Sequence, residues 1–583
     1  MYQGTGMAAA EKKEMKRTDF GDSWIFQKQG SGSRREVRLP HDAMREEERS
    51  ASCLAGPASG YYPGGSYQYE KHMQVSEAEL GEQFILYIGR VHQSARLFVN
   101  DRIISEKKSP LSDWWIDLSI HLRAGSNHIL IQVDNSRQPN ARWYTGSGIL
   151  TGVSLYRGGT ACIRPGSIRV TTQSLDRDGS AAVMLACEIN EAKSQVSTAE
   201  AGLQVHWLVT EPDGESSYEA RGNPATLSIP QARPWSPTSP SLYTVEARLL
   251  TGEMLLDQET ILSGLRVQFW GAGRARINGE RLLLKGACVH HDNGLLGAME
   301  TPESARRKVR LLKEAGFNAI RSAHTPLSEE MLSACDALGL YVMDELTDVW
   351  SVSKNPWDES THFAATWEED LGAMIRKDYS HPCVVLYSIG NEISDLSYSF
   401  GREQHRRMGQ MVRELDGTRP VTNAVNALTA LAPPKELALS TWQARAAKER
   451  EKKKKDRTPR GSALMNVMVT LFPRLLRFVS AGTVRRNLAD VMEAEDVLGL
   501  NYGTGVLGQL CEKQGDLLVV NTETFPREIG KNWSVQSGEG TSRVEVPEIP
   551  VEAIIVAMQV WRDSDIIRHG SPGTPTGYIH THS

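Results

Sequence analysis

The second half of this chain alternates short apolar runs with longer helical ones, and that repeat limits the fold more than any other feature. After Gly273, each strand-like run is followed by a segment with helical periodicity. Repeated βα units predict a parallel sheet, and seven candidate strands favour a (β/α)8 barrel, also called a TIM barrel. We expect strands at 281–288, 319–322, 341–346, 384–388, 420–423, 497–501 and 517–522, and helices at 303–315, 328–337, 363–377 and 403–415.

The first half of the chain has an all-β pattern instead. Short alternating strands separated by turn residues fill 19–157, which predicts a β-sandwich of jelly-roll type. The stretch 162–263 has the same character, and its length of about a hundred residues fits an immunoglobulin-like β-sandwich. We therefore expect a multidomain protein with domains at 15–160, 161–263 and 264–583. Within the last domain, we expect an insertion at about 433–490 and an atypical tail at about 534–583.

The composition is that of an ordinary soluble protein. Forty per cent of the residues are hydrophobic and the net charge is -5, which gives no sign of a nucleic-acid partner. The seven cysteines lack metal-ligand spacing, which favours free thiols in a reducing compartment. The polar start has no apolar region typical of a secretory signal, and the apolar run 465–479 is too short to span a bilayer. We expect a cytoplasmic protein without a membrane partner. The sequence allows a homo-oligomer and does not decide the oligomeric state.

Two glutamates follow strand-like runs that are far apart in the sequence. Glu392 ends the segment Ser-Ile-Gly-Asn-Glu, and Glu523 lies within Asn-Thr-Glu-Thr-Phe. A carboxylate at the end of a buried strand is costly unless it has partners or a chemical role. If both strands belong to one parallel barrel, both side chains reach the same mouth, where the active sites of barrels lie. A pair of facing carboxyl groups is what most enzymes use to cleave a glycosidic bond.

Longer motifs surround these acids and extend over most of the chain. The sequence reads Leu-Pro-His-Asp at 39–42, Arg-Trp-Tyr-Thr-Gly-Ser-Gly-Ile at 142–149 and Asn-Ala-Ile-Arg-Ser-Ala-His at 318–324, and two further motifs lie at 336–342 and 376–392. In this order, the motifs resemble glycoside hydrolase family 2, which includes β-galactosidases, β-glucuronidases and β-mannosidases. The likeness covers about 24–533, and it departs from the family at Tyr387, where Trp is usual.

The resemblance implies a role for each of the two acids, Glu392 as the general acid/base and Glu523 as the nucleophile. A retaining mechanism needs one carboxylic acid to protonate the leaving oxygen and one carboxylate, ~5–5.5 Å away, to attack the anomeric carbon. The resemblance also implies that Asn391 contacts the sugar 2-hydroxyl group. Tyr502 is similar to the family tyrosine that orients the nucleophile, and a buried core tyrosine is the alternative.

Polar residues at other strand ends are further candidates for substrate binding. Arg321 and His324 follow one predicted strand, where they could line the pocket or brace Glu523. Asp344 and Glu345 end the third predicted strand, so one side chain should face the pocket and the other the surrounding helices. Asp344 is therefore a substrate-binding candidate, with an ion-paired structural role as the alternative.

The pair His290-His291 raises the question of a metal site. Adjacent residues on a strand point to opposite faces, so these two cannot readily bind one ion. His290 fits the family's sugar-pocket histidine better than a zinc ligand. We expect no required cofactor, and although Mg²⁺ or Na⁺ binds some relatives, no cluster of oxygen ligands here demands one.

The end of the chain departs from the family pattern. The apolar stretch 554–561 could form the eighth strand, and Trp561 keeps a family-like spacing that makes it a substrate-binding candidate. The residues 570–583 are turn-rich and polar, without a final helix. We interpret this as a truncated or frame-altered C-terminus and expect a barrel that is incomplete at strand eight.

The resemblance predicts a retaining exo-β-glycosidase that hydrolyses terminal β-linked sugars of oligosaccharides or glycosides. A β-galactosidase is the preferred specificity. A β-glucuronidase and a β-mannosidase are alternatives within the family. A catalytically inactive, carbohydrate-binding remnant is the alternative from another class, because the altered C-terminus could leave the barrel unfinished.

Overall fold

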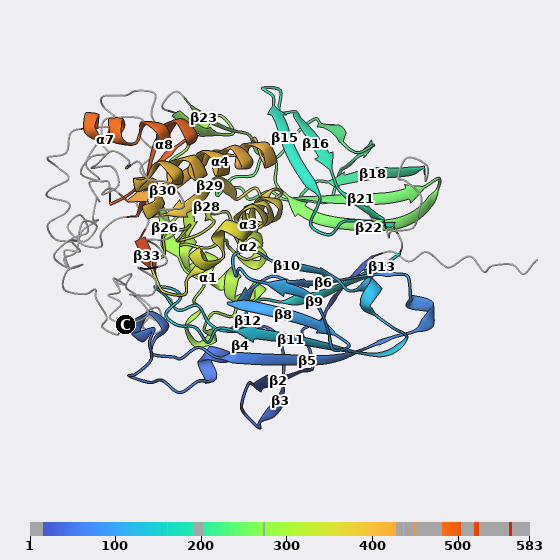
Figure 1. The fold of residues 1–583 in the computed structure, drawn as a ribbon. Coiled ribbons are helices and arrows are strands. Elements are labelled where there is room, and N and C mark those ends of the chain that lie inside the picture. The colour runs from blue at the N-terminus through green and yellow to red at the C-terminus, as the bar shows by residue number, and fades with distance from the viewer. Residues whose placement is uncertain are drawn as a thin grey trace, which may run out of the picture.

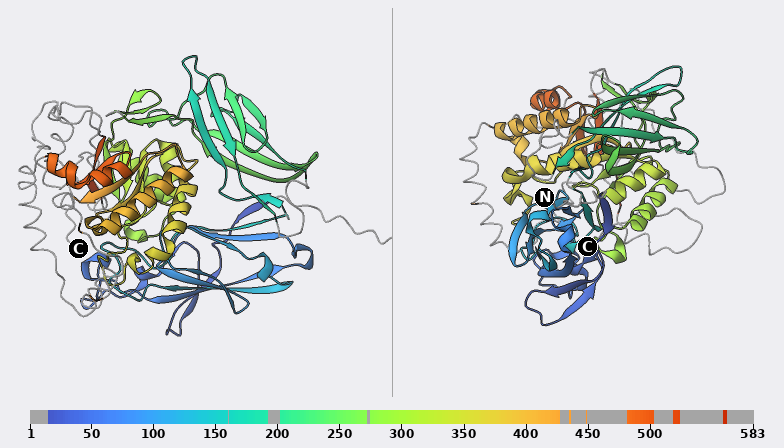
Figure 2. Two further views of the ribbon diagram at one scale, coloured as in Figure 1. Left: turned by 45° about the horizontal axis from the view of Figure 1, so that its top comes forward. Right: turned by 90° about the vertical axis from the view of Figure 1, so that its right-hand side faces the viewer.

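The computed structural model describes residues 15–159, 161–191, 202–271, 274–426, 435, 448, 481–502, 518–523 and 559–561. Most of the predicted insertion at 433–490 and of the predicted tail at 534–583 lies outside these residues. Three groups of sheets follow one another along the chain, and each has its own cluster of buried apolar side chains. Figure 1 shows the barrel and its helices at the left, the second β-region at the upper right and the first β-region below, and Figure 2 gives two further views of the same arrangement.

The first β-region contains two large antiparallel sheets and a small third one. Alternate residues of its long strands face a shared core, as Ile129, Ile131 and Val133 do. In sheet order, the strands are β1 (Lys16–Asp19), β13 (Val153–Gly158), β6 (Gln83–Ile88) and β10 (Trp114–Asp117); β3 (Arg34–Val37), β2 (Trp24–Lys28), β5 (Ser66–Val75), β11 (Gly125–Asp134), β8 (Ser94–Val99) and β9 (Arg102–Lys107); and β4 (His41–Asp42), β12 (Gly148–Ile149) and β7 (Val91–His92).

The second β-region repeats this arrangement with shorter sheets around Trp207 and Tyr243. Its strands are β14 (Ala161–Ile163) and β17 (Ile189–Glu191); β15 (Arg169–Leu175), β16 (Ala181–Ala186) and β20 (Ala225–Ile229); and β19 (Ser217–Arg221), β18 (Leu203–Thr210), β21 (Tyr243–Thr251) and β22 (Met254–Ser263). A small sheet of β23 (Gln268–Gly271), β24 (Arg274–Ile277) and β25 (Glu280–Arg281) leads to the barrel. The jelly-roll and immunoglobulin-like assignments of the two β-regions stay predictions.

Eight parallel strands form the barrel sheet in the order β32, β31, β30, β29, β28, β27, β26, β33. Its strands are nearly all buried on both faces, as expected for a parallel sheet covered by helices. The bounds are β26 (Gly286–Val289), β27 (Ala319–Ser322), β28 (Tyr341–Glu345), β29 (Val384–Asn391), β30 (Val421–Asn426), β31 (Leu498–Asn501), β32 (Val519–Glu523) and β33 (Gln559–Trp561).

Helices cover the outside of this sheet (Figure 1). Thr301 caps the first of them by accepting a hydrogen bond from the Ser304 N–H at 3.2 Å, and Gly339 ends the second in the left-handed conformation. None of the helices in the described ranges has both the length and the apolar character needed to cross a membrane. The bounds are α1 (Pro302–Glu314), α2 (Glu329–Leu338), α3 (Phe363–Asp378), α4 (Ser399–Leu415), α7 (Ala481–Asn487) and α8 (Ala489–Ala494).

The predicted fold class, two β-sandwich regions followed by a TIM barrel that is incomplete at strand eight, is confirmed. Within the described residues, β33 pairs with β26, and no pairing joins β33 to β32. One predicted strand was wrong in its extent. Asn278 and Gly279 both have positive φ and form a turn. After this turn, Glu280–Arg281 pairs with β24 in a hairpin, so the start of the run 281–288 belongs to another sheet. Only Gly286–Val289 belongs to the barrel.

Candidate active site

The polar side chains singled out in the sequence gather where the barrel strands end. Glu392 directly follows β29, and Glu523 is the last residue of β32. Because all strands of this sheet run parallel, their ends lie at one mouth of the barrel. His324, Glu392 and Tyr502 have φ angles of 145°, 46° and 59° there. Non-glycine residues with positive φ are uncommon and cluster at functional sites.

Three nitrogen or oxygen donors surround the carboxylate of Glu523. The Tyr502 hydroxyl donates to Oε1 at 2.9 Å, the Asn501 amide donates to Oε2 at 3.1 Å, and Nη1 of Arg321 lies 3.6 Å from Oε2. Burial raises the pKa of Glu523, the charge of Arg321 opposes that rise, and the carboxylate of Glu392 adds to it. The two acids are therefore close enough to interact electrostatically.

Glu392 has a different environment. Within the described residues, its Oε1 accepts a hydrogen bond from the Asn426 amide at 2.8 Å, and its own N–H donates to the Ala424 carbonyl at 2.7 Å. The register between β29 and β30 shifts between Ser388 and Asn391. A shift of this kind bends a strand and re-aims the side chains that follow it. The irregular end of β29 thus sets the direction of the Glu392 carboxylate.

A buried ion pair braces the floor of the mouth. Arg321 and Glu345 are both 0% exposed, and Nη2 of Arg321 lies 2.8 Å from each Glu345 oxygen. Nδ1 of His324 lies 3.0 Å from Oε1 of Glu345, and the Ser388 hydroxyl donates to Oε2 at 2.8 Å. A buried pair that is this well hydrogen-bonded is costly to break, because either partner alone would be an uncompensated charge.

The side chain of Asn391 connects this ion pair to the carboxylate of Asp348. Oδ1 of Asn391 accepts hydrogen bonds from Arg321 at 2.8 Å and from Asn501 at 2.9 Å. Its amide nitrogen donates to Oδ1 of Asp348 at 2.8 Å. Both groups that contact the amide oxygen are donors and the group at the nitrogen is an acceptor, so the amide has one favourable orientation.

The first β-region contributes side chains to the same mouth. The Trp143 ring lies 5.5 Å from the His290 ring and 5.2 Å from the His324 ring, measured between centroids. Arg142 binds Asp348, with Nη2 2.7 Å from Oδ1 and Nε 3.1 Å from Oδ2. The predicted residues His290 and His324 therefore lie close together, and both contact Trp143 of the first β-region.

The structure does not place the side chains of two predicted substrate-binding residues, Asp344 and Trp561, at the mouth. Asp344 accepts a hydrogen bond from the Leu327 N–H at 2.9 Å, and its other oxygen lies 3.4 Å from Lys377 of α3. Asp344 thus faces the helices, and the neighbouring Glu345 faces the barrel interior, so the predicted substrate contact of Asp344 has no support from its position. Trp561 ends β33, and its side chain lies outside the described residues.

Sequence reasoning missed several residues that contact the predicted site, among them Arg142 and Trp143 of the first β-region. Asn426 and Asn501 end β30 and β31, so polar residues at strand ends were a usable signal. Glu345 was passed over when Asp344 was chosen as the substrate-binding candidate. Asp348 and Lys354 lie in the loop after β28, and nothing in the local sequence pattern marks them. Nζ of Lys354 lies 2.7 Å from Asp348.

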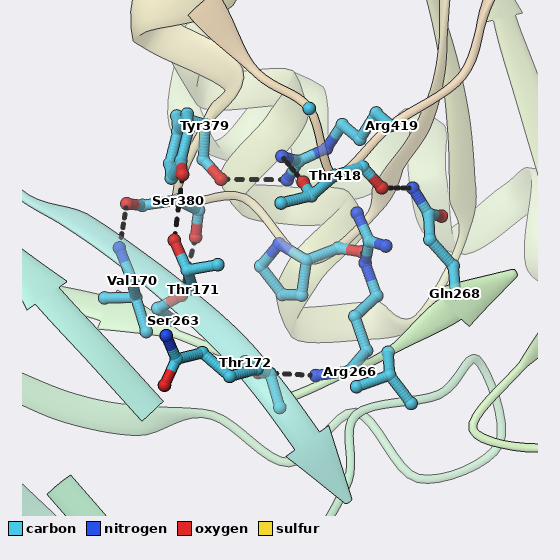
Figure 3. Close-up of a pocket in the computed structure, with 15 residues that line it drawn as sticks. Val170, Thr171, Thr172, Ser263, Arg266, Gln268, Tyr379, Ser380, Thr418 and Arg419 are labelled. Atoms are coloured by element: carbon cyan, nitrogen blue, oxygen red, sulfur yellow. Dashed lines mark hydrogen bonds between the residues drawn. The ribbon is translucent and has the colours of Figure 1, made fainter. Parts of the chain in front are cut away.

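A polar pocket at the opposite end of the barrel does not belong to this site (Figure 3). Its volume is about 250 Å³, and it lies between β15 of the second β-region and the loops that precede β29 and β30. Arg266 crosses it and donates to the Pro382 carbonyl at 2.5 Å, and Arg419 donates to the Tyr379 carbonyl at 2.8 Å. The Ser380 hydroxyl donates to the Ile168 carbonyl at 2.7 Å, and the hydroxyls of Thr171 and Tyr379 lie 2.8 Å apart, so polar contacts join the second β-region to this end of the barrel.

One group in the described part of the chain could offer three ligand atoms to a metal ion, namely Asp336, His381 and Cys383. Both His381 and Cys383 precede β29, so the group lies away from the two glutamates. Its nitrogen and sulfur atoms do not suit Mg²⁺ or Na⁺, which prefer oxygen ligands. Near the glutamates, the Asp348 carboxylate already binds two cationic side chains.

Comparisons with known proteins agree with this architecture. The family models described as Glycosyl hydrolases family 2 and as Glycosyl hydrolases family 2, TIM barrel domain, match residues 165–266 and 271–455. Beta-galactosidase BoGH2A of Bacteroides ovatus is 29% identical over 460 residues, and a putative beta-glucuronidase of Formosa agariphila is 29% identical over 387 residues. The crystal structure of a glycosyl hydrolase family 2 member from Bacteroides cellulosilyticus has a TM-score of 0.74 and 25% sequence identity.

The chain is shorter than these relatives. The alignments cover 70% and 64% of this chain, but 54% of the Bacteroides ovatus protein and 37% of the Formosa agariphila protein. The structural match covers 93% of this chain and 64% of the Bacteroides cellulosilyticus chain. The chain thus spans about half, or less, of the length of the two sequence relatives.

Proposed function

The chain belongs to glycoside hydrolase family 2, and on that premise we propose that it is a retaining exo-β-glycosidase with Glu523 as nucleophile and Glu392 as general acid/base. The observation that carries this assignment is the different environment of the two carboxylates. Glu523 lies among three donors, whereas the Glu392 carboxylate accepts from Asn426. Donors that favour the charged form suit a nucleophile.

The reaction has two steps on these groups. In the first, Glu392 gives a proton to the glycosidic oxygen while an oxygen of Glu523 attacks the anomeric carbon, so the bond to the leaving group breaks and a glycosyl ester forms. In the second, Glu392 takes a proton from water, the water oxygen attacks the same carbon, and Glu523 leaves as carboxylate. Two inversions give net retention of the β configuration.

The surrounding residues position the sugar and the nucleophile. Tyr502 and Arg321 hold the Glu523 carboxylate, and Asn391 donates to the sugar 2-hydroxyl, a contact that strengthens in the transition state. His290 and His324 lie against the ring of Trp143 at the mouth of the barrel, where we place the sugar. No cofactor enters these steps.

The charges at the mouth support a neutral sugar as substrate. In the described part of the mouth, Arg321 is paired with Glu345, and both Arg142 and Lys354 are paired with Asp348. Recognition of a sugar carboxylate would require a cation that is available to bind it. The paired cations therefore favour a neutral sugar over glucuronic acid. Among neutral sugars, the specificity that we propose is for terminal β-linked galactose, with a β-mannosidase as the alternative.

A panel of aryl β-glycosides tests this proposal. We expect wild-type protein to release the aryl group fastest from the β-galactoside, with the sugar appearing first as its β anomer by NMR. The Glu523→Gln variant is the matched control, because it keeps the shape of the side chain and removes the nucleophile. Wild-type protein as inactive as this control on every glycoside would support the inactive remnant instead.

A further inference from the structure

One loop of the first β-region crosses to the barrel mouth. The bridging segment, residues 140–147, is the second part of the connection between β11 and β12, and it carries Arg142 and Trp143 to the strand ends of the barrel. The Arg142 guanidinium contacts both oxygens of Asp348, at 2.7 and 3.1 Å. This two-point contact fixes the plane of the carboxylate as well as its position.

Asp348 is the centre of a small charge network. Besides Arg142, it accepts hydrogen bonds from Nζ of Lys354 at 2.7 Å and from the amide of Asn391 at 2.8 Å. Its side chain is 5% exposed. Burial opposes ionisation, but the charges of Arg142 and Lys354 hold the pKa of Asp348 well below its usual range. Asp348 is therefore an acceptor only, and it selects the nitrogen of Asn391 as its partner.

The bridging segment is itself held by the Leu-Pro-His-Asp motif of the same β-region. The Asp42 carboxylate accepts from the Ser147 N–H at 3.0 Å, the Tyr144 hydroxyl at 2.8 Å and the Ala298 N–H of the barrel at 2.9 Å. Gly146 has φ +68° and lies so close that an added Cβ would be 2.7 Å from Cβ of Ala298. The segment therefore has a defined position relative to the barrel.

The amide of Asn391 is oriented by Asp348, and it is the group that we expect to contact the sugar. One of its N–H bonds is used by Asp348, and its oxygen accepts from Arg321 and Asn501. Among the described residues no other acceptor contacts the second N–H bond of the amide, which we assign to the substrate. A rotated amide would place its NH2 group against two donors and its oxygen against the Asp348 carboxylate, so the ion pair with Arg142 favours the productive orientation.

We propose that Arg142 is a positioning residue of the catalytic site: through Asp348 it fixes the amide of Asn391 and thereby the contact with the sugar 2-hydroxyl group. The inference rests on the proposed glycosidase function and extends it, because it makes the first β-region a part of the catalytic unit. Arg142 touches neither the reacting bond nor the two glutamates in this role. It acts on the transition state through two intervening side chains.

The test compares two substrates in matched variants. The substrates are an aryl β-galactoside and its 2-deoxy analogue, which lacks the hydroxyl in question. The variants are Arg142→Met, Arg142→Lys and the control Arg137→Met. Arg137 lies in the same β-region and stacks on the ring of Trp357 of the barrel, 4.9 Å from its centroid, so its replacement weakens the same domain boundary without touching Asp348.

In Arg142→Met, we expect kcat/KM for the β-galactoside to fall by about 10- to 100-fold, as for a lost hydrogen bond to a charged group. The value for the 2-deoxy analogue should change by less than about threefold, because that substrate does not use the contact. Arg142→Lys should recover part of the loss, since it restores the charge but not the two-point geometry. Arg137→Met should leave the ratio between the substrates unchanged.

Equal losses on both substrates in Arg142→Met, or no loss on either, would overturn the inference while the glycosidase proposal stands on the wild-type activity. A change of the substrate ratio in Arg137→Met would also overturn it, because loosened docking would then be the cause. If wild-type protein cleaves no glycoside, the proposed function fails and this inference fails with it. Thermal unfolding of each variant confirms that folded protein is being compared.

Discussion

Glu392 and Glu523 carry the same functional group, and their neighbours give the two side chains different tasks. Tyr502 and Asn501 donate hydrogen bonds to Glu523, at 2.9 and 3.1 Å. Donors of this kind stabilise a negative charge and hold its oxygens in one direction, as attack on a carbon requires. At the scale of single residues, the account therefore depends on the donors around one carboxylate.

The Tyr502→Phe variant tests that dependence. It removes the hydroxyl that donates to Oε1 of Glu523 and keeps the aromatic ring. We expect kcat/KM on an aryl β-galactoside to fall by about 10- to 100-fold, the range for a hydrogen bond to a charged group. Tyr387→Phe is the control, because it removes a hydroxyl that donates to Asp416 at 3.0 Å, and it should leave kcat/KM unchanged.

The pH dependence of the reaction gives a second test at this scale. Burial raises the pKa of Glu523 above its ordinary value of 4.5, and the Tyr502 hydroxyl lowers it. The nucleophile must be ionised, so activity is lost as the pH falls through this raised pKa. We expect the acidic limb of kcat/KM above pH 4.5 in the wild type and at a still higher pH in Tyr502→Phe. A limb that moves to lower pH in the variant would contradict the assignment.

Residue types at the strand ends could be predicted from the sequence, and the direction of each side chain could not. Both Asp344 and Glu345 end β28, and alternation along a strand requires that they face opposite sides. Which one faces the barrel interior depends on the register of β28 against its neighbours, which no local pattern records. The register places Glu345 beside Arg321 and Asp344 beside Lys377.

At the scale of elements, the end of β29 decides where the acid/base residue points. Its pairing with β30 is interrupted between Ser388 and Asn391, and Gly390 lies within this interruption. An added Cβ at Gly390 would lie 2.6 Å from Cγ1 of Ile393 and 3.1 Å from Nε1 of Trp350. The backbone can follow this path because glycine has no side chain that would collide with Ile393.

The Gly390→Ala variant should therefore displace the end of β29 and the Glu392 carboxylate. We expect a cost of about 1–3 kcal/mol in stability from overpacking. We also expect kcat to fall by at least about tenfold, because a displacement near 1 Å can cost 100-fold. Gly372→Ala in α3 is the control, since its Cβ would meet Cε of Met411 at an ordinary 3.6 Å. Unchanged kcat in Gly390→Ala would show that the glycine does not set the direction of Glu392.

Most elements of the barrel could be predicted from periodicity because each strand and helix has a local signal. The expected strand 319–322 matches β27, and the expected helix 363–377 matches α3 (Phe363–Asp378) within one residue. The strand expected at 281–288 failed because an apolar run does not show which sheet its ends join. Its first residue pairs with β24 in a hairpin instead of entering the barrel.

At the scale of the whole molecule, the first β-region and the barrel share one hydrogen-bonded boundary. The Asp42 carboxylate accepts from Ser147 and Tyr144 of its own region and from Ala298 of the barrel. These contacts were not predictable, because Asp42 and Ala298 are 256 residues apart. The motifs at 39–42 and 142–149 were recognised as signatures of a domain, and the structure shows that they contact each other.

The Asp42→Ala variant should loosen this boundary. It leaves buried N–H groups and a hydroxyl without an acceptor, so we expect the protein to lose about 3 kcal/mol of stability and part of its activity. Asp134→Ala is the control, because Asp134 is exposed and accepts from Ser66 and Ser136 within one domain. Thermal unfolding and limited proteolysis of residues 140–147 measure the effect. Equal stability and equal cleavage in the two variants would argue against a shared boundary.

The central claim is that Glu523 forms a covalent bond with the sugar, and trapping that bond tests it most directly. A 2-deoxy-2-fluoro β-galactoside with a reactive leaving group slows both steps but lets the ester accumulate. We predict that peptide mapping by mass spectrometry finds the fluorosugar on Glu523 and that Glu523→Gln stays unlabelled. A label on another residue, or hydrolysis by wild-type protein with inversion and no label, would contradict the account.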